Sequence, residues 1–431
     1  MDILIAGAGI GGLTAALKLH RLGVRVTVVD AVRELKPLGV GINLLPHGAG
    51  VLYELGLGAG LEAAGIQTRA VEYRTEFGQL ILRDPRGRHA GSPWPQYSIH
   101  RGLLHKLLLD AAIAELPAGR VITDRRVEAF TQSDTHPDAQ SGPRGVTVSV
   151  RSADGRRSEV RTDVLVGADG IHSAICRQMH PDVAGLSFSG TMMWRAAVEA
   201  DPFLDGETMV IAGHHDRKAV LYPISREAFE RGRALINLTA ELHIGSDASY
   251  LPEDWNRSAS VDEFIGRFES FRFDFIDVPA LLRQSSRVFV YPMVDRDPLP
   301  CWSVGQVTLL GDAAHPMYPI GANGASQAIL DADALATAFE DAGVYDPRAA
   351  LRLYEERRLP VTARVVASNR GKGPEAVLQL ARERVKGPDD DVSALITREE
   401  IDAITLGYQK VAGFDSATLA GRASAALKPS T

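Results

Sequence analysis

The first thirty residues constrain the fold more than any other stretch, because they lead without a gap from a strand into a glycine turn and a helix. Residues 3–5 form a short apolar run typical of a buried parallel strand, and Gly7-x-Gly9-x-x-Gly12 follows directly. In this pattern the first glycine allows a tight turn, the second leaves room for a pyrophosphate, and the third lets the helix pack on the strand. The first turn of such a helix attracts a diphosphate through its N–H groups and its dipole.

The residues after this turn complete a dinucleotide-binding unit. Small and apolar side chains give the predicted helix a packing face, and Gly23 ends it. Residues 24–29 alternate into a second strand that ends at Asp30, where a carboxylate holds ribose hydroxyls in such units. A glycine-rich turn that binds nothing is the alternative, but the order of strand, turn, helix, strand and acid favours a dinucleotide site.

The composition restricts the partners and the compartment. A formal net charge of −7 gives no attraction to nucleic acid or to an anionic membrane, and no apolar run is long enough to span a bilayer. Cys176 and Cys301 are the two cysteines and lack metal-ligand spacing, so we expect no metal site and a cytoplasmic location. Asp2 and the glycines that interrupt the N-terminal apolar run argue against a secretory signal. The sequence leaves open whether the chain is a monomer or a homodimer.

Two further strand ends have the same form as the first. Residues 164–170, VLVGADG, lead from an apolar strand into a turn, and residues 307–315, VTLLGDAAH, repeat the pattern. A loop with prolines and glycines at 316–324 then leads into a helix rich in alanine and leucine at 325–339. Three strand ends of this kind imply one large ligand that is contacted from three places in the sequence.

Residues 190–299 differ from this pattern, because their strands alternate and are not each followed by a helix. Strands are predicted at 191–199, 208–212, 219–224, 234–242 and 288–292, with a helical part at 261–271. The pattern indicates an antiparallel sheet inserted into an α/β domain, with a pocket for an aromatic substrate between the sheet and the nucleotide domain.

The remaining predictions are local. They comprise an antiparallel pair at 121–130 and 145–151, an exposed loop at 132–144, a loop at 37–43 whose backbone approaches a flat ligand, helical structure after residue 347 with a kink at Pro360, and a frayed or disordered tail after Gly413.

Together the three turn motifs resemble those of the flavoprotein aromatic hydroxylases with the para-hydroxybenzoate hydroxylase fold. The motifs are Gly7-x-Gly9-x-x-Gly12, Asp169-Gly170-x-x-Ser173 and Gly311-Asp312-Ala-Ala-His315-Pro316. Within the family, segments 37–43, 95–102, 291–300 and 321–331 are most similar to phenazine hydroxylases. The resemblance covers about residues 2–370. It implies an α/β fold, in which a Rossmann-like FAD-binding domain carries an inserted antiparallel β-sheet substrate domain and C-terminal helices.

The domain boundaries follow from these assignments. The FAD-binding domain comprises 1–73, 95–185 and 293–370, the substrate domain comprises a hairpin at 74–94 and the sheet at 186–292, and 371–431 form a C-terminal helical appendage and tail.

The chemistry implied by the resemblance is that NADH or NADPH reduces the FAD and that dioxygen then adds to it. A flavin C4a-hydroperoxide delivers an oxygen atom to an aromatic or N-heteroaromatic small molecule, similar to a phenazine carboxylate or salicylate, with or without decarboxylation. Because most of this reactivity belongs to the flavin, no catalytic acid or base is assigned. His315 is expected to have a structural role at a helix start.

The expected FAD contacts combine the motif positions with the resemblance. They are Gly7, Gly9, Gly12, Leu13, Asp30, Arg33, Gly41, Arg101, Val127, Asp169, Asp312, Gly321, Asn323 and Gly324. Among them the first-motif glycines are assigned to the diphosphate, Asp30 to the ribose, Val127 to the adenine, and Arg101 and Asp312 to the ribityl and phosphate region.

The candidates for substrate contact are Trp194, Met209 and Tyr222. Trp194 and Arg195 are adjacent on an alternating strand and must face opposite sides of it. We prefer Trp194 for stacking on an aromatic substrate, with a role in the core as the alternative.

Two positions depart from the pattern of the family. At the first, the ribose acid is Asp30 where the family usually has glutamate, a shortening that binding should tolerate. The second lies in the second motif. An arginine usually follows the second-motif serine by three residues, and here that position is Cys176, with Arg177 next. A neutral thiol cannot supply a charge-assisted contact to a nicotinamide nucleotide, so we predict weak saturation by NADH or NADPH.

Two other functions stay open. A plain nicotinamide-dependent dehydrogenase would use the first motif alone, and a non-catalytic flavin-binding redox module would not need the inserted sheet. A flavin halogenase shares the fold class, but its WxWxIP signature is absent from this sequence.

Overall fold

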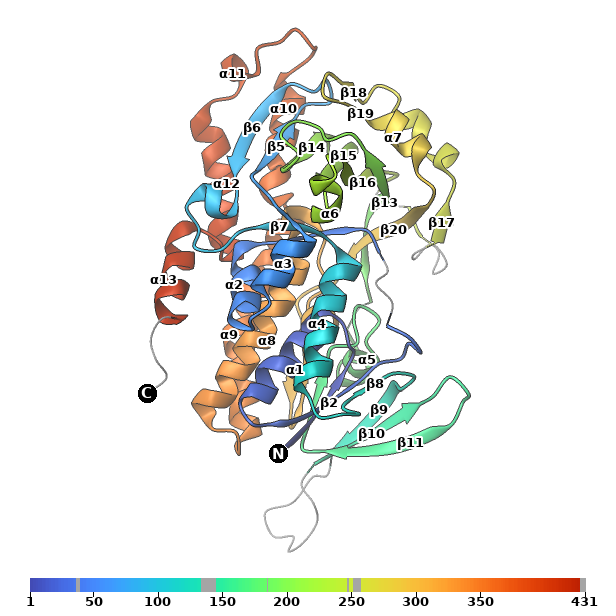
Figure 1. Cartoon of the computed structure of the whole chain (residues 1–431), viewed down its shortest axis with the longest axis vertical. Coiled ribbons are helices and arrows are strands. Elements are labelled where there is room, and N and C mark those ends of the chain that lie inside the picture. Colours follow the sequence, from blue (N-terminus) through green and yellow to red (C-terminus); the bar gives the residue numbers. More distant parts are fainter. Residues whose placement is uncertain (36–38, 133–144, 184, 246–247, 251–256, 427–431) are drawn as a thin grey trace, which may run out of the picture.

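The computed structural model describes residues 1–35, 39–132, 145–183, 185–245, 248–250 and 257–426, and it shows two bodies (Figure 1). One body is built on a mostly parallel sheet with helices, and the other on a large, mostly antiparallel sheet. Helices of the C-terminal part run along both bodies.

A six-stranded sheet organises the first body. Its order is β21-β22-β12-β1-β2-β8, and all neighbours are parallel except β21 and β22. The strands are β1 (Asp2–Ala6), β2 (Arg25–Val29), β8 (Val121–Ile122), β12 (Val164–Gly167), β21 (Ser303–Val304) and β22 (Val307–Leu309). Because β1, β12 and β22 are adjacent and parallel, the three turn motifs that follow them meet at one edge of the sheet.

The apolar character of these strands reflects burial on both faces. Ile3, Leu4 and Ile5 are each at most 1% exposed, as expected for a parallel strand covered on both sides. The helices of this body are α1 (Ile10–Arg21), α4 (Arg101–Glu115), α5 (Ala174–Met179), α8 (Gly324–Ala342) and α9 (Pro347–Arg370). Of these, α1 packs between α4 and α8, and α9 packs on α8 (Figure 1). The helix α9 continues through Pro360, where a kink was predicted.

Two small antiparallel sheets and two short helices complete this body. The sheets are β9 (Arg126–Gln132), β10 (Val146–Arg151) and β11 (Arg157–Thr162), and β3 (Gly41–Leu44), β7 (Tyr97–His100) and β4 (Ile66–Gln67); the helices are α2 (Pro46–Glu54) and α3 (Gly58–Ala64). The predicted pair at 121–130 and 145–151 is confirmed for β9 and β10 but wrong at 121–122. There β8 pairs with β2 instead, because Asp124 turns the chain at φ 56°. The predicted loop at 132–144 lies outside the described residues beyond Gln132.

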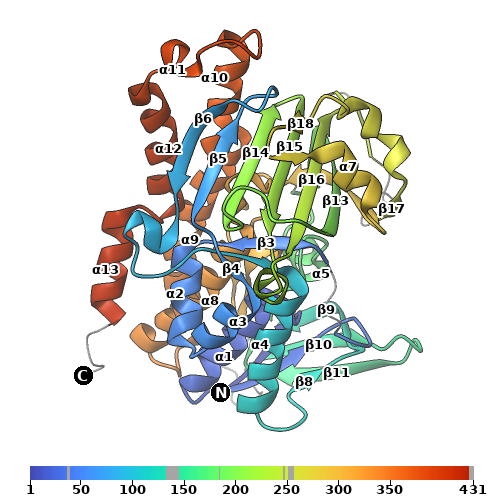
Figure 2. The same cartoon turned by 45° about the horizontal axis from the view of Figure 1, so that its top comes forward.

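An eight-stranded sheet organises the second body (Figure 2). Its order is β17-β20-β13-β16-β15-β14-β5-β6, with β14 and β5 the parallel pair. The strands are β5 (Ala70–Arg74), β6 (Leu80–Pro85), β13 (Ser187–Ala200), β14 (Thr208–His214), β15 (Arg217–Pro223), β16 (Ala234–His243), β17 (Arg257–Ala259) and β20 (Val288–Asp295). The five strands predicted between 191 and 292 are therefore confirmed. The domain boundary predicted after residue 73 falls inside β5, because β5 pairs with both β14 and β6.

The segment predicted as helical at 261–271 has a different structure. It forms two 3₁₀ turns, η3 (Val261–Glu263) and η4 (Ile265–Arg267), and the break lies at Phe264, whose φ of −138° is not helical. Phe264, Phe268 and Phe271 are all buried, so their helix-like spacing serves to pack tight turns against the sheet. The other short elements here are α6 (Arg226–Glu230), α7 (Val278–Gln284), β18 (Arg272–Phe273) and β19 (Ile276–Asp277).

The C-terminal part is helical farther than predicted. Its elements are η7 (Gly373–Glu375), α10 (Ala376–Arg384), α11 (Val392–Leu395), α12 (Arg398–Ala412) and α13 (Ser416–Ala426). The prediction of a frayed tail after Gly413 is wrong for α13, because Phe414 and Leu419 are buried against Leu45, Val365 and Tyr408. Within the described residues, no helix combines the length and the apolar character needed to cross a membrane.

Candidate active site

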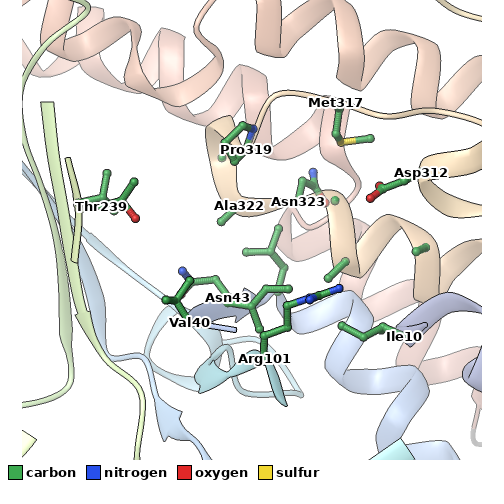
Figure 3. A pocket seen from close by; sticks show the side chains of 18 of the residues that line it. Ile10, Val40, Asn43, Arg101, Thr239, Asp312, Met317, Pro319, Ala322 and Asn323 are labelled. Carbon is green, nitrogen blue, oxygen red and sulfur yellow. The ribbon is translucent and has the colours of Figure 1, made fainter. Parts of the chain in front are cut away.

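A cavity of about 530 Å³ lies between the two bodies (Figure 3). Its wall includes the first-motif turn at 9–12, the third-motif region at 310–325, and strands of the eight-stranded sheet. Residues of η7 and Tyr408 of α12 close it from the C-terminal side. One cavity therefore joins the nucleotide motifs to the inserted sheet.

The first motif leaves open space where a diphosphate would lie. A Cβ atom built on Gly9 meets no heavy atom within 4 Å, whereas one on Gly12 would lie 2.0 Å from the carbonyl oxygen of Gly7. Gly7 itself has φ +110°, which favours glycine. The N-terminus of α1 has no side-chain cap and no acidic residue in its first turn. This cradle fits the diphosphate of FAD.

Asp30 stabilises the turn that it faces. One carboxylate oxygen accepts a hydrogen bond from the backbone N–H of Ala8 at 2.7 Å, and the other accepts one from the N–H of Val32 at 2.9 Å. The residue directly follows β2 beside the glycine turn, at the position expected for a ribose contact.

A buried network centred on Asp331 of α8 holds the third motif. Its carboxylate accepts hydrogen bonds from the N–H of Gly311 at 3.1 Å and from Nε of Arg358 at 2.7 Å, and it lies 2.5 Å from Nε2 of His315. Although burial acts to raise it, the charges of His315 and Arg358 lower the pKa of Asp331. His315 thus has the structural environment that was expected. Asp312 points into the cavity (Figure 3), and desolvation by the surrounding protein raises its pKa.

Arg101 and the loop before β3 form another part of the wall. The cap of α4 is His100, whose Nδ1 accepts from the N–H of Gly102 at 3.2 Å, so the side chain of Arg101 is not needed for capping. It points into the cavity (Figure 3). The carbonyl of Gly41 accepts from Arg195 at 2.7 Å, and its N–H donates to Asn237 at 2.8 Å. The backbone of Gly41 is therefore engaged by the inserted sheet.

The loop at 316–324 approaches the cavity with little side-chain volume. A Cβ atom on Gly321 would lie 2.2 Å from the hydroxyl of Tyr408, and Gly321 has φ +71°. Asn323 and Gly324 also line the cavity.

Several predicted FAD contacts lie outside the cavity wall. The side chain of Leu13 is in the core, and its N–H donates to the carbonyl of Gly9 at 2.9 Å. Val127 is buried in the same core, and Arg33 is exposed. Asp169 accepts from the N–H of Ala174 at 2.8 Å at the start of α5, while its neighbours Ala168 and Gly170 line the cavity. Burial raises the pKa of Asp169.

The eight-stranded sheet decides which predicted substrate residues reach the cavity. Met209 and Tyr222 line it, but Trp194 does not. Trp194 lies in the core on the other face, where its ring stacks on Phe264 at 4.7 Å and 16°. The preference for Trp194 is corrected, because alternation along β13 directs Met193 and Arg195 into the cavity instead.

The sequence did not predict four charged residues of the wall: Arg86, Arg195, Glu241 and Glu375. Alternation along the strand predicted that Arg195 faces the side opposite to Trp194, but it did not predict which of the two sides meets the cavity. Glu241 lies across from Met193 on β16 and so shares its face. No local sequence signal indicates Glu375, which lies a few residues beyond the predicted end of the FAD-binding domain at residue 370.

Cys176, at the position where the family motif has an arginine, is buried and contacts another arginine. Cys176 is 3% exposed, and its Sγ accepts a hydrogen bond from Nη1 of Arg296 at 3.1 Å. Arg296 also donates to the carbonyls of Ala313 and Ile171, both at 3.3 Å. A guanidinium is thus present at this position, supplied by the segment after β20.

The chain matches known flavoproteins in sequence and in structure. A family model described as FAD binding domain matches residues 1–369. The chain is 42% identical to phenazine 1,6-dicarboxylic acid hydroxylase PhzS of Lysobacter antibioticus, over 95% of the chain and 97% of that protein. It is 33% identical to 3-amino-4-hydroxybenzoate 2-monooxygenase PtnB3 of Streptomyces platensis, over 97% and 98%. Its fold matches HpxO of Klebsiella pneumoniae in complex with FAD and uric acid, with a TM-score of 0.70, 22% identity, and coverage of 99% and 97%.

Proposed function

The chain belongs to the FAD binding domain family and is an FAD-dependent aromatic monooxygenase, and from this premise we propose that it hydroxylates an aromatic or N-heteroaromatic carboxylate with NADH or NADPH and dioxygen. The observation that carries the proposal is the single cavity, which extends from the diphosphate turn to Arg195 on the inserted sheet. A plain dehydrogenase is disfavoured because all three motif regions contribute to this cavity.

The residues that line the cavity form two groups, one that binds FAD and one that binds the substrate. When bound, FAD supplies the redox chemistry that activates dioxygen. The Gly9–Gly12 turn and the start of α1 hold its diphosphate, and Arg101 and Asp312 lie farther along the wall. The inserted sheet then orients the substrate and excludes water from it, with Met209 and Tyr222 providing apolar surface.

Arg195 is the candidate anchor for a substrate carboxylate. Its guanidinium donates a hydrogen bond to the carbonyl of Gly41 at 2.7 Å. In the described part of the chain no carboxylate pairs with it, whereas Arg86, another arginine of the wall, pairs with Asp84 at 2.7 Å. A planar guanidinium whose charge is not neutralised suits a carboxylate. The carboxylate-bearing substrates named for the similar proteins agree with this assignment.

A substrate screen tests the activity, and an arginine variant tests the anchor. Phenazine, quinoline and hydroxybenzoate carboxylates are tested for stimulation of NADH consumption, and mass spectrometry of the products distinguishes oxygen insertion from insertion with loss of CO₂. We expect Arg195→Met to raise the KM of the active carboxylate about tenfold or more, since a hydrogen bond to a charged group contributes about 1.5–3 kcal/mol. FAD content should not change. Arg233→Met, an exposed arginine paired with Asp201, is the control.

Two results would contradict the proposal. If none of the carboxylates stimulates NADH consumption, the proposed activity is wrong for these substrate classes. If one does and Arg195→Met leaves its KM unchanged, the carboxylate is held elsewhere in the cavity.

A further inference from the structure

Three charged side chains form a buried cluster where the cavity meets the C-terminal segment. Nζ of Lys218 on β15 lies 2.9 Å from Glu241 on β16 and also donates a hydrogen bond to Glu375 of η7. The three side chains are only 8%, 9% and 10% exposed. Burial of this kind is costly unless the charges are paired, and here one ammonium serves two carboxylates.

The cluster has one ammonium and two carboxylates, so one carboxylate can accept a proton. Although burial opposes its charge, the two carboxylates raise the pKa of Lys218, which therefore stays an ammonium. Burial, supported by Glu241, raises the pKa of Glu375 in spite of Lys218. With both carboxylates ionised the cluster carries a net negative charge, which attracts a hydrogen-bond donor and repels an anion.

Both carboxylates of the cluster line the cavity. Glu241 lies opposite Met193, and the next cavity-facing pair on the same two strands is Arg195 and Thr239. In an antiparallel pair such diagonal neighbours are about 7–8 Å apart, so an arene can span from Arg195 to Glu241. Glu375 belongs to η7, which packs against η6 (Ile320–Ala322) in the loop beside the flavin site.

A second, smaller cavity of about 30 Å³ lies behind the cluster. Lys218, Glu241 and Glu375 line it together with His214, His215 and Lys372. Its volume suffices for one or two water molecules. The ammonium of Lys372 lies 3.1 Å from Nε2 of His215, and burial with Lys372 lowers the pKa of His215 to about 4. The half-buried His215 and Lys372 connect the cluster toward the surface.

The electrostatic surroundings of Glu375 include groups from each of these elements. They are Lys218 and Glu241 on the sheet, Lys372 before η7, Tyr73 on β5 and Tyr408 on α12. His214 and His215 line the smaller cavity beside these groups, and the charge of Asp216 acts on Lys372 and His215.

We propose that Glu375 and Glu241 accept a hydrogen bond from a hydroxyl, amino or ring N–H group of the substrate. During the reaction Glu375 also accepts the proton of that group. This inference rests on the proposed function and specifies its substrate as an aromatic acid with such a donor at the end remote from its carboxylate. The O–H or N–H bond breaks, its electron pair stays on the heteroatom and enriches the ring, and the proton passes to Glu375. Lys218 is a positioning residue that holds the two carboxylates together.

A matched pair of probes tests the inference on the FAD-loaded enzyme. The dissociation constants of 4-hydroxybenzoate and 4-methoxybenzoate are measured from the perturbation of the FAD absorbance, which does not depend on turnover. Both probes keep the carboxylate, and only the first has a hydroxyl donor. We expect the enzyme to prefer the hydroxyl probe about tenfold or more, as for a hydrogen bond to a charged acceptor. Glu375→Gln and Glu241→Gln should each reduce this preference to about threefold or less, which is within the range of a neutral acceptor.

The pH dependence gives a second measurement. Since the acceptor is the ionised carboxylate, the preference should be present above the raised pKa of Glu375 and disappear as the pH falls through it. In Glu375→Gln this inflection should be absent, and Glu375→Asp should restore part of it.

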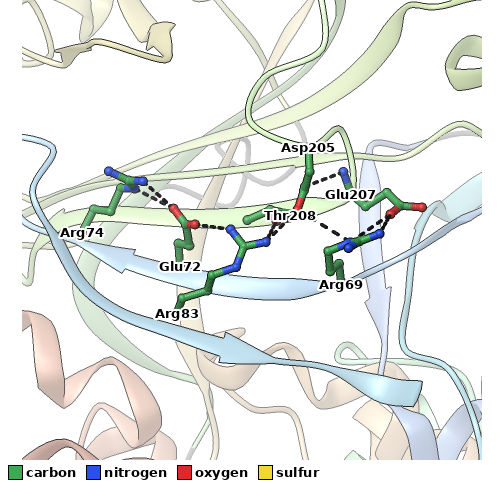
Figure 4. A network of polar contacts seen from close by, with 7 residues as sticks. All are labelled: Arg69, Glu72, Arg74, Arg83, Asp205, Glu207 and Thr208. Atoms are coloured by element: carbon green, nitrogen blue, oxygen red, sulfur yellow. Dashed lines mark hydrogen bonds and ion pairs between the residues drawn. The ribbon is translucent and has the colours of Figure 1, made fainter. Parts of the chain in front are cut away.

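Glu72→Gln is the control for the loss of a buried glutamate. Glu72 forms ion pairs with Arg74 and Arg83 on the β5–β6 hairpin (Figure 4). Its side chain is 3% exposed, and it does not line the cavity. Its substitution should lower the Tm without changing the ratio of the two dissociation constants.

The outcomes separate this inference from the proposed function. If the wild-type enzyme has no hydroxyl preference, or if both glutamine variants keep it with an unchanged pH profile, the acceptor role is overturned. If one variant does not fold, the other decides. If the preference depends on Glu375 or Glu241 while no carboxylate stimulates NADH consumption, the acceptor is supported and the proposed activity fails.

Discussion

Single residues in this protein take their roles from the side of the strand on which they lie. Trp194 and Arg195 are neighbours on β13, yet one packs on Phe264 in the core and the other enters the cavity. A large aromatic residue near a substrate domain is thus no evidence of stacking on the substrate, because its ring can serve the packing of the sheet equally well.

We expect Trp194→Ala to affect stability rather than substrate binding. Loss of a buried tryptophan ring costs about 3–5 kcal/mol of unfolding free energy. Urea unfolding should show this decrease, while the dissociation constant of the substrate stays within about twofold, because the ring lies outside the cavity. A weakened substrate affinity without a loss of stability would restore the stacking role that the sequence suggested.

At Cys176 a residue distant in the sequence, Arg296, places a guanidinium beside the position where the family motif has an arginine. Its thiol already accepts a hydrogen bond from Arg296, and burial raises its pKa, so the neutral form is held. A second guanidinium at this position would meet Arg296 in a buried space.

We therefore expect Cys176→Arg to lower the Tm and to leave the KM for NADH unchanged or higher. The weak saturation predicted from the sequence would instead have Cys176→Arg lower this KM, because the substitution restores the arginine of the motif. Cys301→Arg, at a half-buried position, should lower the Tm less and serves as the control. A stable Cys176→Arg protein with a lower KM would show that Arg296 does not replace the motif arginine.

At the scale of elements, the C-terminal helices complete the site instead of trailing from it. The single hydroxyl proton of Tyr408 on α12 is shared between two acceptors, the carbonyl of Ile320 at 3.2 Å and Oδ1 of Asn369 at 3.0 Å, which supports the loop beside the flavin site. Phe414 and Leu419 attach α13 to the same core. Arg422 of α13 bonds to Asp333 of α8, which also pairs with Lys18 at 2.6 Å.

A matched pair of leucines tests whether α13 is an integral element. Leu419 is 3% exposed, and Leu406 on α12 is 51% exposed. We expect Leu419→Ala to lower the unfolding free energy by about 2–5 kcal/mol and Leu406→Ala to change it by no more than about 0.5 kcal/mol. Equal effects in chemical denaturation would mean that α13 is not held in solution.

At the scale of the whole molecule, the cavity lies between two bodies and is lined by both. A ligand that fills such a cavity bridges the bodies, so its binding free energy adds to the stability of the folded chain. FAD is therefore expected to be a structural as well as a chemical component.

The stability of the apoprotein tests this linkage. We expect FAD at about 100 times its dissociation constant to add about 2.7 kcal/mol, seen as a rise in Tm. Gly9→Leu should fold, since a Cβ atom at Gly9 has open space, but it should purify colourless and show no FAD-dependent rise because its side chain fills the diphosphate position. Gly266→Leu, which also has open space, should keep the yellow colour. A yellow Gly9→Leu protein would place the diphosphate elsewhere.

Features of this protein that have local signals could be read from the sequence. The Gly7–Gly12 turn, the Asp312 turn and the five inserted strands were predictable because a turn or a strand is encoded by residues adjacent in the chain. Which face of β13 meets the cavity depends on how the sheet packs in three dimensions, since a period of two defines two faces but not what packs on either. The tertiary structure also brought Glu375 to Lys218 across 157 residues, and Asp331 to His315 and Arg358. Such contacts depend on the packing of distant elements, and no pattern of neighbouring residues encodes them.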